Sequence, residues 1–102
     1  MKSTKQAIAE LKEIRTEMMK VKGVLDMSGV LTIRDGEWFY FTYAGKQFAI
    51  DFNYEENTFG FFSANGTFEI LPNTDYVEHK TPKQIIKRAK SILRIFKNLL
   101  ED

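Results

Sequence analysis

Five basic residues recur at helical spacing in the last quarter of the chain, and we call them the basic stripe: Lys83, Lys87, Lys90, Arg94 and Lys97. Spacings of three and four residues place them on one side of an α-helix, along about 21 Å of its length. No acidic residue interrupts this segment before Glu101. Lysine and arginine at this density bind acidic ligands, so the stripe is a candidate ligand-binding site.

Three kinds of acceptor fit the basic stripe. An acidic partner protein and the phosphates of nucleic acid would both pair with it. The third acceptor is the chain itself, because Glu10, Glu13 and Glu17 form an acidic stripe on the predicted first helix. Nucleic acid is less favoured than protein, since no helix-turn-helix, zinc module or aromatic RNA-binding signature accompanies the cations.

A second candidate site consists of three aromatic residues that strand alternation places opposite the most phenylalanine-rich face: Trp38, Tyr40 and Phe62. Exposed aromatic side chains are favoured at protein interfaces. Asp51 and Glu69 fall on the same face and would repel phosphate, so a partner protein or a second copy of the chain is favoured over stacked bases. The competing interpretation is purely structural, with a helix or a second subunit covering these residues.

The sequence contains few of the side chains that enzymes most often use in catalysis. His79 is the single histidine and the chain has no cysteine, and we interpret His79 as a solvated loop residue rather than a base. Residues 51–56 approximate a calcium loop, but Glu56 stands where an EF-hand requires glycine. We therefore predict a protein that is not an enzyme and holds no metal or cofactor.

The composition predicts one domain, residues 1–102. The lack of cysteine favours a cytoplasmic location, and the charged N-terminal segment predicts neither a signal peptide nor a membrane span. Net charge is +3 over residues 1–22, −7 over 23–79 and +5 over 80–102. Basic helices would therefore dock on an acidic sheet, although each exposed ion pair contributes only about 0 to 1 kcal/mol.

Two helices are predicted at the ends of the chain. Ser3 and Gln6 form a capping box before an apolar series at helical spacing, and Gly23 is placed to end that helix. Thr81 and Pro82 supply the N-cap and first residue of the final helix. Its predicted apolar face comprises Ile85, Ile86, Ala89, Ile92, Leu93, Phe96, Leu99 and Leu100.

Between the helices the apolar period changes to two, which predicts strands over residues 30–34, 37–43, 46–52, 58–63 and 67–71. Turns are predicted at residues 35–36, 44–45 and 65–66. Because directly opposed residues share a face, the pairings Phe41 with Phe48, Phe52 with Phe59 and Phe61 with Ile70 generate one Phe-rich face. Its predicted members are Phe39, Phe41, Phe48, Ile50, Phe52, Phe59, Phe61, Phe68 and Ile70.

The turn at residues 35–36 leaves two alternatives. A two-residue turn places Leu31 and Ile33 with Trp38 and Tyr40, whereas a three-residue loop with a bulge places them on the Phe-rich face. In either case we predict an α+β fold with an N-terminal helix, a five-stranded antiparallel β-meander and a C-terminal helix. Both helices are predicted to pack on the Phe-rich face.

The function predicted from these features is a small non-catalytic partner-binding or regulatory protein, of accessory or inhibitor type, acting through protein–protein contacts. A homodimer fits the same features, and no membrane partner is expected. The alternative is a nucleic-acid-binding module that uses the basic stripe. Small size and a composition rich in lysine, isoleucine and phenylalanine suit a bacterial or bacteriophage accessory protein.

Overall fold

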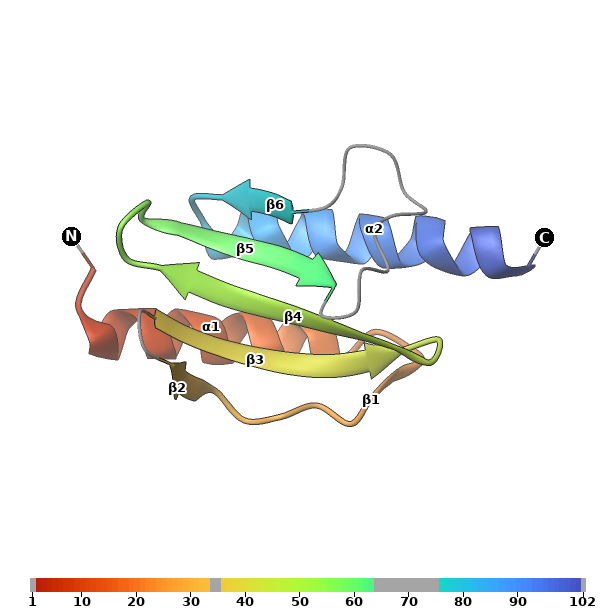
Figure 1. The fold of residues 1–102 in the computed structure, drawn as a ribbon, viewed down its shortest axis with the longest axis horizontal. Coiled ribbons are helices and arrows are strands. Elements are labelled where there is room, and N and C mark those ends of the chain that lie inside the picture. Colours follow the sequence, from red (N-terminus) through yellow and green to blue (C-terminus); the bar gives the residue numbers. More distant parts are fainter. Residues whose placement is uncertain (1, 34–35, 64–75, 102) are drawn as a thin grey trace.

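The fold is an antiparallel sheet with two helices packed on one of its faces (Figure 1). The computed structural model describes residues 2–33, 36–63 and 76–101. The elements in chain order are α1 (Thr4–Met19), β1 (Val24–Leu25), β2 (Leu31–Ile33), β3 (Gly36–Tyr43), β4 (Lys46–Asn53), β5 (Thr58–Ser63), β6 (Tyr76–His79) and α2 (Pro82–Glu101). The predicted α+β class and the order of helix, sheet and helix are confirmed.

Strands β2 to β6 follow one another across the sheet as a meander, and β1 adds a short pairing at the far end of β3. Between β1 and β2 the chain stays on the β3 edge through Ser28. The Ser28 N–H donates to the Tyr40 carbonyl at 2.9 Å, and Ser28 Oγ accepts from the Tyr40 N–H at 3.0 Å. The strand predicted from residue 30 begins at Leu31, Arg34 at its predicted end lies outside the described residues, and β1 was not predicted.

The central register agrees with the predicted pairings. Ala44 and Gly45 adopt positive φ angles of 52° and 78°, as a two-residue turn between twisted strands requires. Phe41 therefore lies opposite Phe48, and Phe52 lies opposite Phe59.

One predicted pairing is wrong. Phe61 has Ile50 on one side and Val77 on the other, so β6 occupies the edge of β5 that was assigned to Ile70. The predicted strand at 67–71 and the turn at 65–66 lie outside the described residues.

The register of β2 decides between the two alternatives for Leu31. Leu31 lies opposite Trp38, and Ile33 lies opposite Gly36, so the position of Leu31 is on the Trp38 face. A side chain at residue 36 would collide with the Phe52 carbonyl oxygen, which explains the glycine where the β2–β3 hairpin approaches β4.

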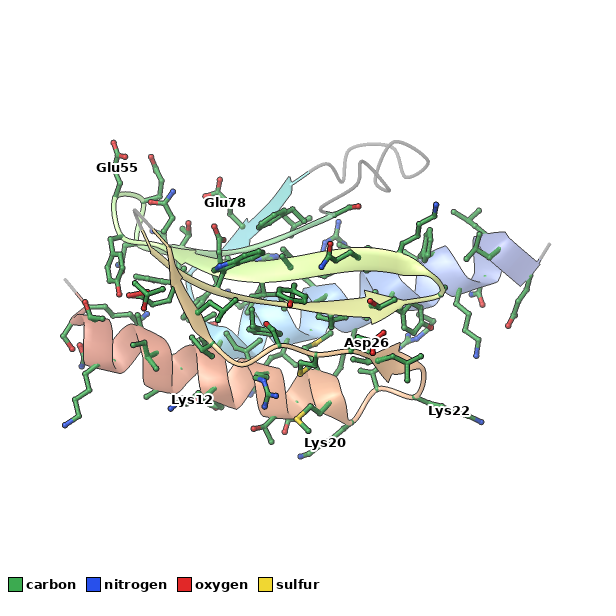
Figure 2. All side chains as sticks on the ribbon, turned by 60° about the horizontal axis from the view of Figure 1, so that its bottom comes forward. Lys12, Lys20, Lys22, Asp26, Glu55 and Glu78 are labelled. Atoms are coloured by element: carbon green, nitrogen blue, oxygen red, sulfur yellow. The ribbon has the colours of Figure 1, made fainter. Side chains whose placement is uncertain are left out.

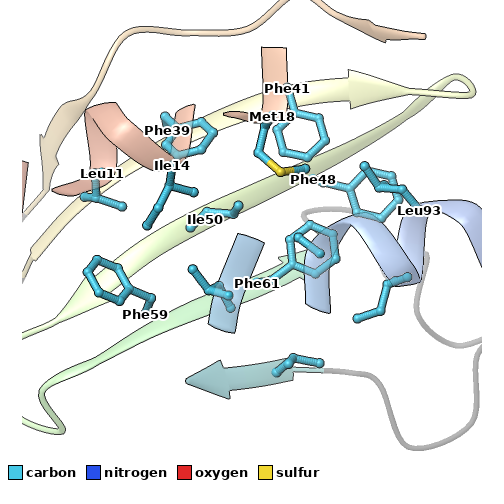
Figure 3. Packing of buried hydrophobic residues seen from close by; sticks show 14 of the residues in the cluster. Leu11, Ile14, Met18, Phe39, Phe41, Phe48, Ile50, Phe59, Phe61 and Leu93 are labelled. Carbon is cyan, nitrogen blue, oxygen red and sulfur yellow. The ribbon is translucent and has the colours of Figure 1, made fainter. Parts of the chain in front are cut away.

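The hydrophobic core lies between the Phe-rich face and the two helices (Figure 3). Helix α1 packs on β3 and β4, and α2 packs on β5 and β6. Stacked rings run across the centre, with Phe48 and Phe61 centroids 5.5 Å apart, and the edge of Phe96 meets Phe48 at 5.7 Å. All predicted members of the Phe-rich face that the structure describes are buried: Phe39, Phe41, Phe48, Ile50, Phe52, Phe59 and Phe61. Phe68 and Ile70 lie outside the described residues.

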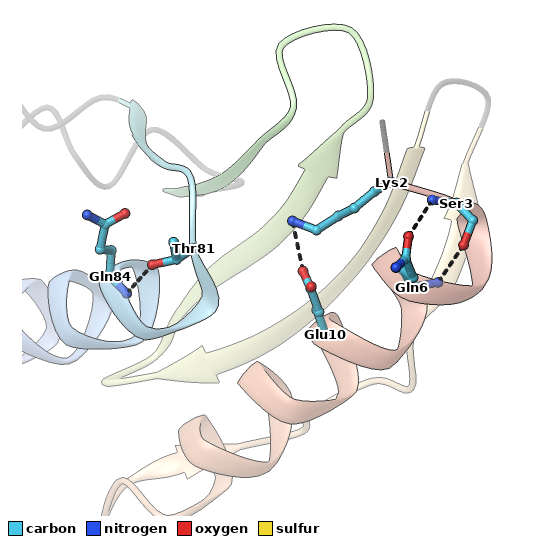
Figure 4. Close-up of polar contacts among 6 residues, drawn as sticks. All are labelled: Lys2, Ser3, Gln6, Glu10, Thr81 and Gln84. Atoms are coloured by element: carbon cyan, nitrogen blue, oxygen red, sulfur yellow. Dashed lines mark hydrogen bonds and ion pairs between the residues drawn. The ribbon is translucent and has the colours of Figure 1, made fainter.

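Side-chain caps begin both helices as predicted (Figure 4). Ser3 Oγ accepts from the Gln6 N–H at 3.1 Å while Gln6 Oε1 accepts from the Ser3 N–H at 3.0 Å, and Thr81 Oγ1 accepts from the Gln84 N–H at 3.2 Å. Helix α1 ends at Met19, before Gly23, because the Val21 N–H already turns back to the Met18 carbonyl.

The C-terminal end of α2 corrects the predicted apolar face. Leu99 is 47% exposed and Leu100 is 53% exposed, although both were expected to anchor the helix. The cause is length, because the last turns of α2 extend beyond the end of the sheet (Figure 1). The apolar face is buried from Ile85 to Phe96, apart from half-buried Ile86.

A buried acid at the start of β3 was missed by the sequence analysis. Glu37 is only 2% exposed, and its Oε1 accepts a 2.7 Å hydrogen bond from the Tyr54 hydroxyl. Alternation back from Phe39 places residue 37 on the Phe-rich face, so the signal was present in the sequence. The edge of the core nearby is covered by Lys2, whose ammonium lies 4.8 Å from the Phe59 ring centre and pairs with Glu10 at 2.9 Å (Figure 4).

The first testable consequence concerns the Phe-rich face. Phe41→Ala should lower the free energy of unfolding by about 3 to 5 kcal/mol, because it removes a fully buried ring and leaves a cavity. Chemical denaturation measures this change. Thr42→Ala, one residue along and on the other face, should cost much less. A loss below about 1 kcal/mol for Phe41→Ala would contradict the assignment of this face as the core.

The second prediction concerns the hydrogen bond between the Tyr54 hydroxyl and the Glu37 carboxylate. Tyr54→Phe should cost about 1 to 3 kcal/mol, because a buried acceptor loses its donor. Burial, with Glu37 adding to it, raises the pKa of the Tyr54 phenol above 10.0. The folded state therefore binds the phenol proton more tightly than the unfolded state does. The contribution of this proton to the free energy of unfolding is complete below about pH 10 and decreases as the pH rises further. Denaturation at pH 7 and pH 10.5 should show a smaller difference between wild type and Tyr54→Phe at the higher pH; an equal or larger difference would refute the linkage.

Candidate binding surfaces

The structure brings the three aromatic residues predicted as a partner site onto one face of the sheet. Trp38 and Tyr40 are both half-buried on β3, with ring centroids 5.6 Å apart and planes tilted by 45°. Across the strands, Tyr40 lies opposite Ala49 and Ala49 lies opposite Phe62. Ala49, which stands between them in this row, is fully buried, and the row places all three aromatic residues on the same face of the sheet.

We call this surface, together with Leu31, the aromatic face. Leu31 is 41% exposed and extends the face to β2. Both helices lie on the other side of the sheet, and in the part of the chain that the structure describes no element covers the aromatic face (Figure 2). Trp38 Nε1 is enclosed without an acceptor among the described residues.

The aromatic face also carries acidic side chains. Asp51 lies opposite Trp38, and Glu78 lies two strands further along the same row through Gly60. Glu78 is exposed and accepts a hydrogen bond from the Thr58 hydroxyl at 3.0 Å. Glu69, the other acid predicted on this face, lies outside the described residues. The described part of the face therefore combines apolar rings with negative charge.

All five residues of the basic stripe lie on α2. Four are exposed and Lys90 is half-buried. Lys90 Nζ lies 3.6 Å from Glu17 Oε1 on α1, and Lys97 Nζ lies 3.9 Å from Glu101 on its own helix. Lys83, Lys87 and Arg94 form no ion pair with the residues that the structure describes.

The acidic stripe of α1 neutralises less of the basic stripe than full internal pairing would require. Glu17 is shared between Lys90 and the closer Lys20, at 2.7 Å, and the hydrogen bond from Lys20 is the main cause that lowers the pKa of Glu17. Glu10 pairs with Lys2 instead. Pairing between the two helices thus reaches one of the five stripe residues, and most of the positive charge faces solvent.

His79 differs from its predicted setting. It is the last residue of β6 rather than a loop residue, it is half-buried, and it lines a hollow of about 230 Å³ with Lys87, Arg88 and Ser91. Within the described ranges, no three histidine or acidic side chains group as metal ligands would. In residues 51–56, whose spacing only approximates a calcium loop, Asn53 Oδ1 accepts from the Glu56 N–H at 3.1 Å.

Comparison of the chain with protein-family models, with curated proteins and with solved structures found no match. Neither α1 nor α2 is apolar over a stretch that could cross a membrane, and these are the helices in the described part of the chain. Function must therefore be inferred from the two surfaces themselves.

The contact between the two helices gives a third prediction. Lys90→Glu places a second carboxylate beside Glu17, so the Tm should fall at low salt and recover as salt screens the repulsion. Lys83→Glu makes the same charge change where the described structure has no ion pair, and its Tm should respond less. Thermal melts from about 10 mM to about 500 mM salt provide the comparison, because the Debye length shortens strongly over this range. Equal salt dependence for the two variants would mean that the Lys90–Glu17 contact is absent in solution.

Proposed function

We propose that this protein is a small non-catalytic partner-binding or regulatory protein that uses its aromatic face to contact another protein. The observation that carries the proposal is the asymmetry of the sheet. One face is buried under two helices, whereas the other carries Trp38, Tyr40, Phe62 and Leu31 and has no helix over it among the described residues. Apolar surfaces of this kind on a small protein mark interaction sites.

The character of the face supports a protein partner over nucleic acid at this surface. Bases could stack on Trp38 or Tyr40, but the phosphates that accompany them would meet the exposed carboxylate of Glu78. A partner with apolar groups at its centre and basic groups at its edge would complement the face. A second copy of this chain is one such partner, and a different protein is another.

Other features agree with a regulatory role inside the cell. The full sequence has no cysteine, which supports a cytoplasmic location. Its single histidine shares a hollow with Lys87, Arg88 and Ser91 of α2, and the described residues that line this hollow include no carboxylate. Binding without chemistry is therefore the role that the site residues support best, and an accessory or inhibitor protein fits this size.

The second candidate function is nucleic-acid binding through the basic stripe. The observation in its favour is that Lys83, Lys87 and Arg94 are exposed and form no ion pair within the described residues. The two functions differ in their response to salt: phosphate contacts weaken steeply as salt rises, whereas an aromatic interface weakens little. They also differ in where a mutation should abolish binding: on the aromatic face for a protein partner, and on the basic stripe for nucleic acid.

Affinity capture from native lysate tests the proposal directly. Tyr40→Ala and Trp38→Ala should each reduce recovery of a specific protein several-fold, because central aromatic residues contribute most of the binding energy at interfaces. Leu99→Ala, which removes an exposed leucine outside the aromatic face, should leave recovery unchanged. Sedimentation of the purified protein shows whether the partner is a second copy.

Three outcomes decide the matter. A partner that survives nuclease treatment and high salt, and is lost only in the aromatic-face variants, supports the proposal. Capture that nuclease abolishes, with the aromatic-face variants unaffected, would establish the second function instead. A monomer whose variants capture the same proteins as wild type would refute a role for the aromatic face.

A further inference from the structure

On the helical side of the molecule, three separate elements enclose a concave surface that the sequence analysis did not anticipate. The segment after α1, the β3–β4 turn and α2 border two adjoining hollows of about 270 Å³ and 250 Å³. The hollows share Lys22, Tyr43 and Lys97. We call the combined site the basic pocket. It lies on the face that carries the helices, away from the aromatic face.

Four cations line the basic pocket, and they come from two different elements. Lys22 follows α1, and Lys90, Arg94 and Lys97 are the last three members of the basic stripe. The only acids paired with these cations in the described structure are Glu17, at 3.6 Å from Lys90, and Glu101, at 3.9 Å from Lys97. Glu17 lies closer to Lys20. Lys22 and Arg94 form no ion pair with the residues described, so the pocket has a surplus of positive charge.

The floor of the pocket is apolar. Its apolar lining residues are half-buried Val21 and the almost fully buried Leu93 and Tyr43. Gly23 keeps one wall open, because a side chain at this position would begin 3.2 Å from the Tyr43 ring, and the φ of 99° favours glycine. Positive charge above a concave apolar floor concentrates the electric field and favours a compact multivalent anion that has an apolar portion.

We infer that the basic pocket binds a phosphorylated small molecule of about mononucleotide size, with its phosphates between Lys22, Arg94 and Lys97. The guanidinium of Arg94 offers the planar pair of donors that fits a phosphate, and the lysines add point charges. The rest of the ligand would lie against Val21 and Tyr43. The concave shape favours this ligand over duplex nucleic acid, which would contact the whole length of the basic stripe. This binding is independent of the aromatic face and would add a ligand-dependent input to a regulatory protein.

The experiment uses ADP as the probe, with calorimetry at low salt on the full chain. Arg94→Gln combined with Lys97→Gln should weaken ADP binding at least tenfold, because two of the four cations are removed while helix propensity is kept. The matched control is Lys80→Gln combined with Lys83→Gln, which removes two exposed cations that line neither hollow. Its affinity should stay within about twofold of wild type. Lys22→Gln tests the pocket from a second element and should also weaken binding.

Competition identifies the chemical class of the ligand. Pyrophosphate should displace ADP but bind more weakly, because it reaches the cations without using the apolar floor. The inference fails if ADP does not bind at millimolar concentration, or if the pocket and control variants lose affinity equally. It also fails if pyrophosphate does not compete. A single-stranded oligonucleotide that binds tightly to a protein with no affinity for ADP would assign the cations to nucleic acid instead.

Discussion

The register of the three central strands is the constraint on which the rest of this structure depends. Because β3, β4 and β5 pair with Phe41 opposite Phe48, Phe52 opposite Phe59 and Ile50 opposite Phe61, one face of the sheet is almost entirely aromatic. A shift of one residue in any of these pairings would move phenylalanines to the opposite face. Both helices must then cover the same side, since that is where the apolar surface lies. The aromatic face therefore carries neither of the two helices.

The exceptions to this pattern occur at the ends of the core. Glu37 falls on the Phe-rich face by alternation, yet it lies where the sheet meets Tyr54 rather than in the centre. A hydrogen bond from a phenol keeps one buried carboxylate oxygen satisfied. At the other end, α2 extends past the sheet and leaves Leu99 and Leu100 exposed. A sheet of fixed length covers only part of a 20-residue helix.

Charge is distributed by the same architecture. Two described acids of the middle segment, Asp51 and Glu78, lie on the aromatic face, while lysines and arginines of the two end segments lie on the helical side. The molecule therefore has two surfaces of different chemistry, one aromatic and acidic and the other basic and concave. Folding brings Lys22 beside Arg94 and Lys97, although they are far apart in the sequence.

The sequence by itself determined the helices, the α+β class and the central pairings, because period, capping residues and turn residues are local signals. The Ser3–Gln6 cap, the Ala44–Gly45 turn and the parity of the phenylalanines were all readable in this way. Trp38, Tyr40 and Phe62 of the aromatic face and the five residues of the basic stripe were also readable, since the former follow strand parity and the latter lie within one helix.

Other features were decided only by the tertiary structure, because each depends on contacts between segments distant in the chain. They include the pairing of β6 with β5, the position of Leu31, and the single ion pair between the helices. The basic pocket belongs with them. Its walls come from three elements, and no local pattern could place Tyr43 and Lys22 beside α2. The apolar periodicity of the sequence determines which face of an element a residue occupies, whereas tertiary packing determines which residues from different elements come into contact.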